Sequence, residues 1–415
     1  MFSLFCFTST PLSVAEEELC DADNAANFYI KAGRSLRSSI SDNAEIKSNG
    51  LIVSDDFIVY VPVEQKHLIA NYVLPETVQL LSRGATCGRC DWGSHFEDGL
   101  VSQILYLTEM QVLIDSLIEY DIHLLENGKT SEGLTLWVDI MTLIRHLSYN
   151  RVLVSVSASC KAEMKCLDVI LHRMRLLNED NIFFLIEKCR RIPERISVCE
   201  SLDYQKEIML KWMKMKPLSF YQYFFPDQTV SFYTDGTLVG YPNSIPFESL
   251  MPGIIFVAKT KSGLIDLKLV ELYLDKMKRV AGMAWEDRES ATLLLYDDIK
   301  DIKSEVEKTI LKRYLPHTLW RNTEQIADEK RMFFDSTLRV YYEYLREPAC
   351  EKCNVFLGRM QYNKQGNGFD LQYSTQSRRH RITITDTKAL YSEVFVQQHQ
   401  EKSAPVQWIS PDPKP

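Results

Sequence analysis

The strongest constraint on the fold is a pair of apolar stripes at helical spacing, separated by one short turn. Leucine, isoleucine and methionine recur at helical steps between 107 and 124, and the pattern returns between 134 and 144. Asn127-Gly128 lies between the stripes, and glycine readily takes the left-handed conformation that ends a helix. Amphipathic helices joined by so short a turn lie antiparallel. The sequence therefore predicts an αα-hairpin over 99–148.

Helical periodicity extends over most of the remaining chain. A second hairpin is expected over 152–191, with its turn at Asn178-Glu179-Asp180. Consecutive hairpins bury their apolar faces against their neighbours. The predicted fold class is mainly α, with antiparallel helical hairpins in a TPR-like or α-solenoid-like arrangement. Further helices are expected at 24–38, 64–82, 202–215, 263–283, 296–314 and 322–346.

Minor β elements and a change in composition divide the chain. Strands are expected near 51–61, 229–239 and 369–385, and Thr234-Asp235-Gly236 is a plausible hairpin turn. Proline and glycine are frequent between 216 and 262. The predicted organisation is a signal peptide at 1–15, a helical-hairpin domain at 16–215, a Pro/Gly-rich connection at 216–262, a second helical region at 263–347 and a polar C-terminal segment with a disordered tail at 348–415.

The first residues favour export. Phe2 to Phe7 form a short apolar stretch, and the small residues Ser13 and Ala15 precede an acidic run that starts at Glu16. No lysine or arginine precedes the apolar stretch, which departs from the usual signal peptide. We expect an exported protein, periplasmic or otherwise extracytoplasmic. The alternative is a hydrophobic N-terminal arm of a cytoplasmic protein.

Composition narrows the class of protein. The chain has 415 residues, of which 45% are hydrophobic and 25% charged, as in ordinary globular proteins. Its formal charge of −8 argues against a general nucleic-acid binder, because phosphate contacts need a basic face. Beyond the N-terminus no apolar run approaches the roughly 18 residues of a membrane-spanning helix. We therefore expect no nucleic-acid partner and no integral membrane span in the mature chain.

Two C-x-x-C pairs, Cys87/Cys90 and Cys350/Cys353, are the sharpest chemical features. Neither is followed by the histidine of a haem attachment site. A thioredoxin-like dithiol needs its first cysteine at the start of a helix, whereas Cys87 follows one. Together the pairs have the ligands of a structural zinc site, but about 260 residues separate them, far more than in ordinary zinc ribbons. We favour local disulfides or structural thiols and predict no cofactor, with zinc at these four cysteines as the alternative.

Acidic residues and one histidine follow Cys87 and Cys90. Side chains of these types can act as general acids and bases. Ser94 and Glu97 have the S-x-x-E spacing of a capping box, which explains the glutamate without catalysis. Trp92 is expected to fill the core of the hairpin. We therefore predict no catalytic residue in this group, which consists of Asp91, His95, Glu97 and Asp98.

A basic cluster at Ser377-Arg378-Arg379-His380-Arg381 stands out on an acidic chain. It could bind an anion or an acidic partner. We favour a solvated strand edge, because charged side chains commonly protect exposed edges.

Short motifs of common enzyme classes are absent from the sequence. It contains no G-x-G-x-x-G, Walker A, G-x-S-x-G or H-E-x-x-H pattern. Helical hairpins leave a long surface for partners. The predicted function is a non-enzymatic, exported helical scaffold that binds another protein. The alternative is a thiol-redox or structural-zinc protein that uses the two C-x-x-C pairs.

Three short motifs carry a resemblance to a known group of proteins. They are Asn-Ala-Ala-Asn-Phe-Tyr at 24–29, Cys-Asp-Trp-Gly at 90–93 and Phe-Glu-Asp-Gly-Leu at 96–100. Over residues 20–215 the chain resembles an uncharacterised family of exported α-helical proteins of planctomycete-type bacteria. The resemblance implies export and a helical fold, and it implies no activity.

Overall fold

A computed structural model defines the fold, and the predicted signal peptide, the C-terminal tail, Cys350 and Cys353 all lie outside the residues it describes. The structure describes 23–41, 52–53, 58–60, 70–93, 104–215, 231–234, 237–239, 257–260, 263–264, 267–314, 320–347, 360–365, 368–375, 378–385 and 388–395.

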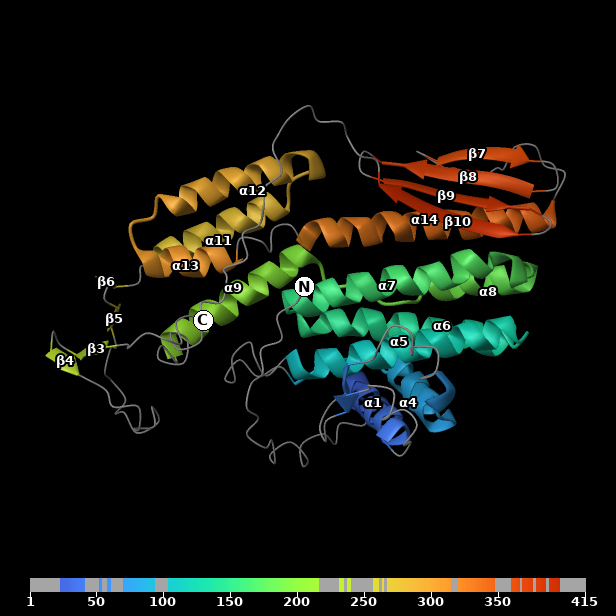
Figure 1. Ribbon diagram of the computed structural model, residues 1–415, viewed down its shortest axis with the longest axis horizontal. Coiled ribbons are helices and arrows are strands. Elements are labelled where there is room, and N and C mark those ends of the chain that lie inside the picture. Colours follow the sequence, from blue (N-terminus) through green and yellow to red (C-terminus); the bar gives the residue numbers. More distant parts are fainter. Residues whose placement is uncertain are drawn as a thin grey trace.

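The protein is mainly helical, as the apolar periodicity predicts (Figure 1). The α-helices are α1 (Ala25–Ser41), α4 (Pro75–Thr86), α5 (Ile104–Glu126), α6 (Thr130–Leu147), α7 (Leu153–Arg173), α8 (Glu179–Cys189), α9 (Val198–Met215), α11 (Leu267–Ala281), α12 (Trp285–Lys300), α13 (Glu305–Tyr314) and α14 (Trp320–Arg346). Short 3-10 helices are η2 (Ala70–Tyr72), η4 (Ser148–Asn150) and η5 (Met174–Leu176).

The two predicted hairpin turns are confirmed. Gly128 ends α5 with a φ of +77°, and the amide of Lys129 donates to the carbonyl of Leu124 at 3.0 Å, which closes the helix end. In the turn before α8, the Asn178 side chain accepts from the Asn181 amide at 2.9 Å, and the Asn181 side chain accepts from the Asn178 amide at 3.2 Å. This reciprocal cap fixes where α8 begins.

The expected helix over 64–82 is wrong. Leu74 is extended, with φ −77° and ψ 153°, and α4 begins at Pro75. Proline disfavours the helical conformation in the residue before it and suits the first position of a helix. The apolar periodicity of the sequence therefore does not reveal that a helix starts at Pro75.

The expected single helix over 296–314 is also wrong, because α12 and α13 are separate helices. The chain leaves α12 at Asp301, and the Ser304 carbonyl accepts from the Lys308 amide at 3.1 Å as α13 begins. Ser304 and Glu307 have the S-x-x-E spacing that is typical of a helix start. No glycine or proline marks this break, so the apolar periodicity by itself predicts one continuous helix.

One hydrophobic core joins segments that are far apart in sequence. Its buried residues come from α1, α4 to α8, α14 and the sheet formed by the C-terminal strands, and we call this unit the central body. Trp137 of α6 and Phe334 of α14 stack with ring centroids 5.5 Å apart, and the Trp137 indole donates to the Cys166 carbonyl at 2.8 Å. In Figure 1, α14 runs along α7, with the sheet close beside it.

The C-terminal sheet is antiparallel, in the order β10-β9-β8-β7. The strand pair expected near 369–385 is confirmed as β8 and β9. The other two strands, β7 and β10, were not predicted. β7 is rich in glutamine and asparagine, which are weak strand formers, so its sequence gives little strand signal. The strands are β7 (Met360–Gln365), β8 (Gly368–Ser374), β9 (Arg378–Ile384) and β10 (Ala389–Phe395).

Smaller strands confirm the other two expected β regions. The predicted hairpin near 229–239 is present, with Tyr233 opposite Leu238. This pair belongs to a second antiparallel sheet in the order β4-β3-β5-β6. The strands are β1 (Ile52–Val53), β2 (Ile58–Tyr60), β3 (Ser231–Thr234), β4 (Thr237–Val239), β5 (Val257–Thr260) and β6 (Gly263–Leu264).

Among the described helices, none combines the length and apolar composition that a bilayer crossing requires. The mainly helical class is thus established, whereas a TPR-like repeat and the five-part division of the chain remain predictions.

Candidate functional site

The loop that carries Cys87 and Cys90 is fixed against the start of α1. The Asn24 side chain accepts from the Asp91 amide at 2.8 Å and donates to the Asp91 carbonyl at 2.7 Å. The amide of Ala25 donates to the Arg89 carbonyl at 2.9 Å. These bonds hold the C-x-x-C loop in one position, although 67 residues separate Asn24 from Asp91.

Trp92 packs the loop against the central body, so the predicted core position of this tryptophan is confirmed. Its side chain is 8% exposed, and its indole donates to the His146 carbonyl at 2.8 Å. The Tyr29 hydroxyl lies 2.8 Å from Nδ1 of His146, and the Tyr29 and Trp92 rings stack at 6.1 Å. Burial lowers the pKa of His146 to about 4, so this imidazole is neutral at neutral pH.

A surface hollow of about 610 Å³ lies at the outer side of this loop, and we call it the Cys87 hollow. The thiol of Cys87 donates to the Arg83 carbonyl at 3.3 Å, at the end of α4. Behind it, the Cys90 thiol lies 4.0 Å from the His146 carbonyl, and burial raises its pKa. The hollow is lined by Asp23, Phe28, Arg83, Thr86, Cys87, Gly88 and Arg89.

This geometry weakens the thioredoxin-like interpretation. Cys87 caps the C-terminus of α4, whereas a redox dithiol uses a helix N-terminus to stabilise its thiolate. Cys87 and Cys90 are thiols in the structure, so the expected local disulfide is not formed between them. Within the described ranges, no three or more His, Cys, Asp or Glu side chains gather as metal ligands. The other pair and the residues His95, Glu97 and Asp98 lie outside those ranges, so the four-cysteine zinc site stays a prediction.

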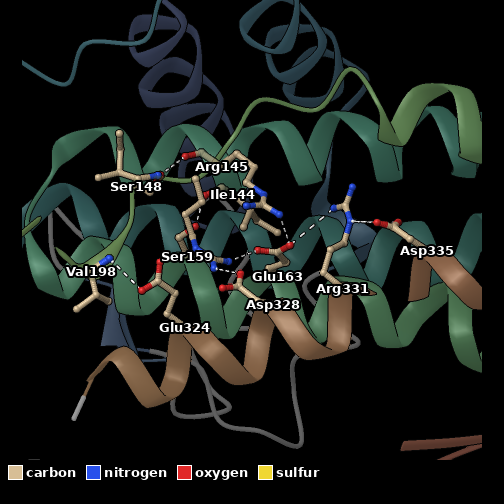
Figure 2. Close-up of polar contacts among 12 residues, drawn as sticks. Ile144, Arg145, Ser148, Ser159, Glu163, Val198, Glu324, Asp328, Arg331 and Asp335 are labelled. Atoms are coloured by element: carbon tan, nitrogen blue, oxygen red, sulfur yellow. Dashed lines mark hydrogen bonds and ion pairs between the residues drawn. The ribbon is translucent and has the colours of Figure 1, made fainter. Parts of the chain in front are cut away.

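Among the described residues, an extended polar cluster forms around a buried glutamate and was not predicted (Figure 2). The fully buried carboxylate of Glu163 on α7 pairs with Arg145 of α6 and accepts from Arg195 at 2.6 Å. Nη1 of Arg331 on α14 lies 3.7 Å from Glu163, and Arg195 also donates to Asp328 at 2.5 Å. We call these five residues the Glu163 cluster.

The Glu163 cluster connects three helices and the chain that follows α8. Nearby, the Val198 amide donates to the Glu324 carboxylate at 3.1 Å, and the Ser159 hydroxyl donates to the Ile144 carbonyl at 2.7 Å (Figure 2). All these partners belong to the chain itself, and buried ion pairs of this kind fix the position of helices. The chemistry it supports is therefore structural.

The sequence contains one signal of this cluster. Glu163 lies on the buried stripe of α7, between Cys160 and Leu167 at helical spacing. A glutamate is almost never fully buried unless it is paired. The partners lie 18 to 168 positions away and share no motif, so their identity could not be read from the sequence.

The basic cluster at 377–381 is divided by the alternation of strand β9. Arg378 pairs with Glu393, while Arg381 donates to Asp370 at 2.8 Å. His380 points into the interior and is fully buried, with Nδ1 3.1 Å from the Tyr391 hydroxyl. The expected strand edge is wrong, because β9 pairs with β8 and β10 and is therefore an inner strand.

A second buried charge lies where this sheet meets α14. The ammonium of Lys330 is 2.6 Å from Asp168 of α7 and 3.4 Å from Glu393 of β10. Burial lowers the pKa of Lys330 and lowers that of the neighbouring His380 to about 4. These contacts bind the sheet to the helices.

Comparison with protein families, with curated proteins and with solved structures finds no match to this chain.

Proposed function

We propose that this chain is a non-enzymatic helical scaffold that binds another protein through the outward side of α12. The observation that carries the proposal is a pair of adjacent leucines, Leu293 and Leu294, which are 52% and 69% exposed. The opposite side of α12 is buried through Leu295 and Ile299. Contiguous exposed apolar side chains on a folded helix are typical of an interaction surface.

The charges around these leucines indicate the chemistry of the partner. Asp287 and Glu289 are exposed on the preceding turns of α12. Together with the two leucines they form what we call the α12 face. Electrostatic complementarity favours a partner protein whose apolar side chains are flanked by lysine or arginine.

The central body supports a scaffold role. Its interior charges are engaged with one another, in the Glu163 cluster and around Lys330. Such pairs hold helices in place and are inaccessible to a substrate. The consecutive hairpins α5–α6 and α7–α8 are also what a TPR-like array would use.

Export is part of the proposal and rests on residues 1–15 and on the resemblance to exported helical proteins. The intact mass of natively expressed protein tests it. A mature chain that starts at Glu16 supports export, and a full-length chain contradicts it.

The alternative function is that of a thiol-redox or zinc protein that uses the two C-x-x-C pairs, of which Cys87 and Cys90 are free thiols in the structure. Metal analysis of protein purified under reducing conditions separates the two. One bound zinc per chain, lost in C87S and C350S alike, would support the zinc alternative and count against a plain scaffold.

Binding is tested with a double variant and a matched control. L293D/L294D places two carboxylates on the α12 face, while L390D/V394D does the same to exposed side chains of β10, which are 51% and 57% exposed. A partner co-purified from the native source should be lost with L293D/L294D and retained with L390D/V394D. Equal retention by both variants would contradict the α12 face, as would a complex that contains only copies of this chain.

A further inference from the structure

The outer face of the C-terminal sheet carries basic and apolar side chains that the proposed function does not use. The inner face packs against the helices through buried side chains such as Tyr373 and Ile382. Successive side chains of a strand point to opposite faces, so their neighbours along the strands point away from the helices. In the paired strands β9 and β10 (Figure 1), these neighbours include cations and exposed apolar residues. We call this group the β9–β10 face, which consists of Arg379, Arg381, Leu390, Val394 and the adjoining Lys388.

The register of the two strands interleaves charge and apolar surface. Val394 lies opposite Arg379, and side chains that are directly opposed on one face have Cβ atoms about 5 Å apart. Lys388 extends the row beyond Leu390, because its carbonyl accepts from the Thr385 amide at 2.9 Å and continues the ladder. At about 3.3 Å per residue, the row from Lys388 to Val394 is about 20 Å long. Along this length, three cations alternate with two apolar side chains.

The cations of the β9–β10 face are not neutralised by acidic side chains at the surface. The acidic residues in the described parts of these four strands are Asp370 and Glu393, whose side chains are 5% and 18% exposed. Arg381 donates to Asp370 at 2.8 Å and is still 49% exposed. Within the described part of the chain, Arg379 and Lys388 have no ion-pair partner. The face is therefore positive, although the chain has a formal charge of −8.

From this charge and register we infer that the β9–β10 face binds an acidic protein segment whose apolar side chains stand between glutamates or aspartates. Leu390 and Val394 are 51% and 57% exposed and contact the apolar side chains of the segment. The guanidinium groups of Arg379 and Arg381 bind its carboxylates, for which their planar donors are well suited. Complementary charge gives such an interface its specificity and orientation.

A nucleic acid fits this face less well than an acidic protein. Its phosphates offer no apolar side chains for Leu390 and Val394. It also carries a negative charge at every nucleotide, which the net negative charge of the rest of the chain repels. The partner also differs from that of the α12 face, whose acidic surroundings favour lysine and arginine. The inference is therefore independent of the proposed function.

The test uses the full chain and a labelled random copolymer of glutamate and tyrosine as the probe, with binding measured by fluorescence anisotropy at low salt. The copolymer should bind roughly tenfold more tightly than polyglutamate or single-stranded DNA of similar charge, because it alone combines carboxylates with apolar side chains. Added salt should weaken binding, because the charges are exposed. Equal affinity for all three polymers would indicate nonspecific attraction of anions and would overturn the inference.

Charge variants locate the binding surface. R379E/K388E reverses two cations and keeps the pair of Arg381 with Asp370, so the copolymer should bind roughly tenfold more weakly while circular dichroism stays unchanged. K161E/R191E makes the same change in charge at exposed residues of α7 and of the chain after α8, and should alter the affinity by less than about twofold.

Apolar variants test the other half of the β9–β10 face. L390D/V394D should weaken binding of the copolymer, whereas L293D/L294D on α12 should leave it unchanged. The inference is overturned if R379E/K388E binds the copolymer like K161E/R191E, or if L390D/V394D binds it as tightly as the unmodified chain.

Discussion

The central body and the group formed by α11, α12 and α13 use charge in different ways. In the central body, the Glu163 carboxylate is fully buried among three arginines that come from distant parts of the chain. In the α11–α13 group, by contrast, the pair of Lys276 and Asp298 lies at the surface, with side chains that are 34% and 57% exposed. Buried pairs fix tertiary structure, whereas surface pairs contribute little.

Exposed apolar side chains occur in both parts, but their arrangement differs. In the central body, Leu390 and Val394 of β10 are 51% and 57% exposed and lie four residues apart along a strand, whereas Leu293 and Leu294 of α12 are adjacent in sequence and are 52% and 69% exposed. This difference supports the proposal that the central body stabilises the fold and that α12 carries a binding surface.

The largest expected effect is that of E163Q. The neutral amide keeps the shape of the side chain and leaves three buried guanidinium groups without their central carboxylate, so the free energy of unfolding should fall by about 3–5 kcal/mol. Urea denaturation measures this loss. E126Q is the matched control, because it removes the partner of Arg173 in a pair where Glu126 is 56% exposed, and its effect should stay below about 1 kcal/mol. Equal losses would contradict a special role for the Glu163 cluster.

Acid should destabilise the central body through His146 and His380. Both have a pKa of about 4 in the folded protein and about 6.5 when unfolded, so the unfolded state binds more protons as pH falls between these values. Their contribution is present above pH 6.5 and is lost as pH falls towards 4.

Between pH 7 and pH 5 each histidine should lower the free energy of unfolding by about 2 kcal/mol. Urea denaturation at the two pH values measures the net change, to which buried carboxyls with a raised pKa, such as Asp121 and Asp139, contribute with the opposite sign. H380F should reduce the loss between the two pH values by about 2 kcal/mol, while H123N, which changes an exposed residue of α5, should leave it unchanged. A pH dependence that H380F does not alter would contradict the assignment.

The contact between α1 and α4 should tolerate little change in volume. A methyl group at Gly84 would lie 2.5 Å from the ring of Tyr29, which is fully buried and bonded to His146. G84A should therefore cost about 1–3 kcal/mol, measured by thermal or chemical unfolding. G88A is the control, because no atom lies within 4 Å of a methyl group there. A neutral G84A would show that α1 can move away from α4.

The smallest effect on stability is expected on the α12 face. L293D/L294D should lower the free energy of unfolding by less than about 1 kcal/mol, mostly through helix propensity, because both leucines are exposed. Circular dichroism with urea denaturation measures it. A loss as large as that of E163Q would show that these leucines pack against the protein.

Sequence reasoning captured local features and missed long-range ones. Gly128 and the Asn178 cap are encoded within a few residues, so both hairpin turns could be predicted. Strand β7 was missed because its sequence is polar, and the Glu163 cluster was missed because Arg195 and Arg331 reach the same carboxylate from separate segments. The C-x-x-C motif and its place after a helix could be predicted, whereas the position of its loop against α1 could not, because the contacting residues are distant in sequence. Sequence patterns predict local structure, whereas contacts between distant segments depend on tertiary packing.

Hydrogen exchange of the full chain, free and bound to a protein co-purified with it from the native source, tests the central claim most directly. The account predicts slower exchange on binding for peptides within 285–300, with little change in α7 and α14, whose amides already lie in the buried framework. Protection confined to the central body, with α12 unchanged, would contradict the proposed division between framework and binding surface.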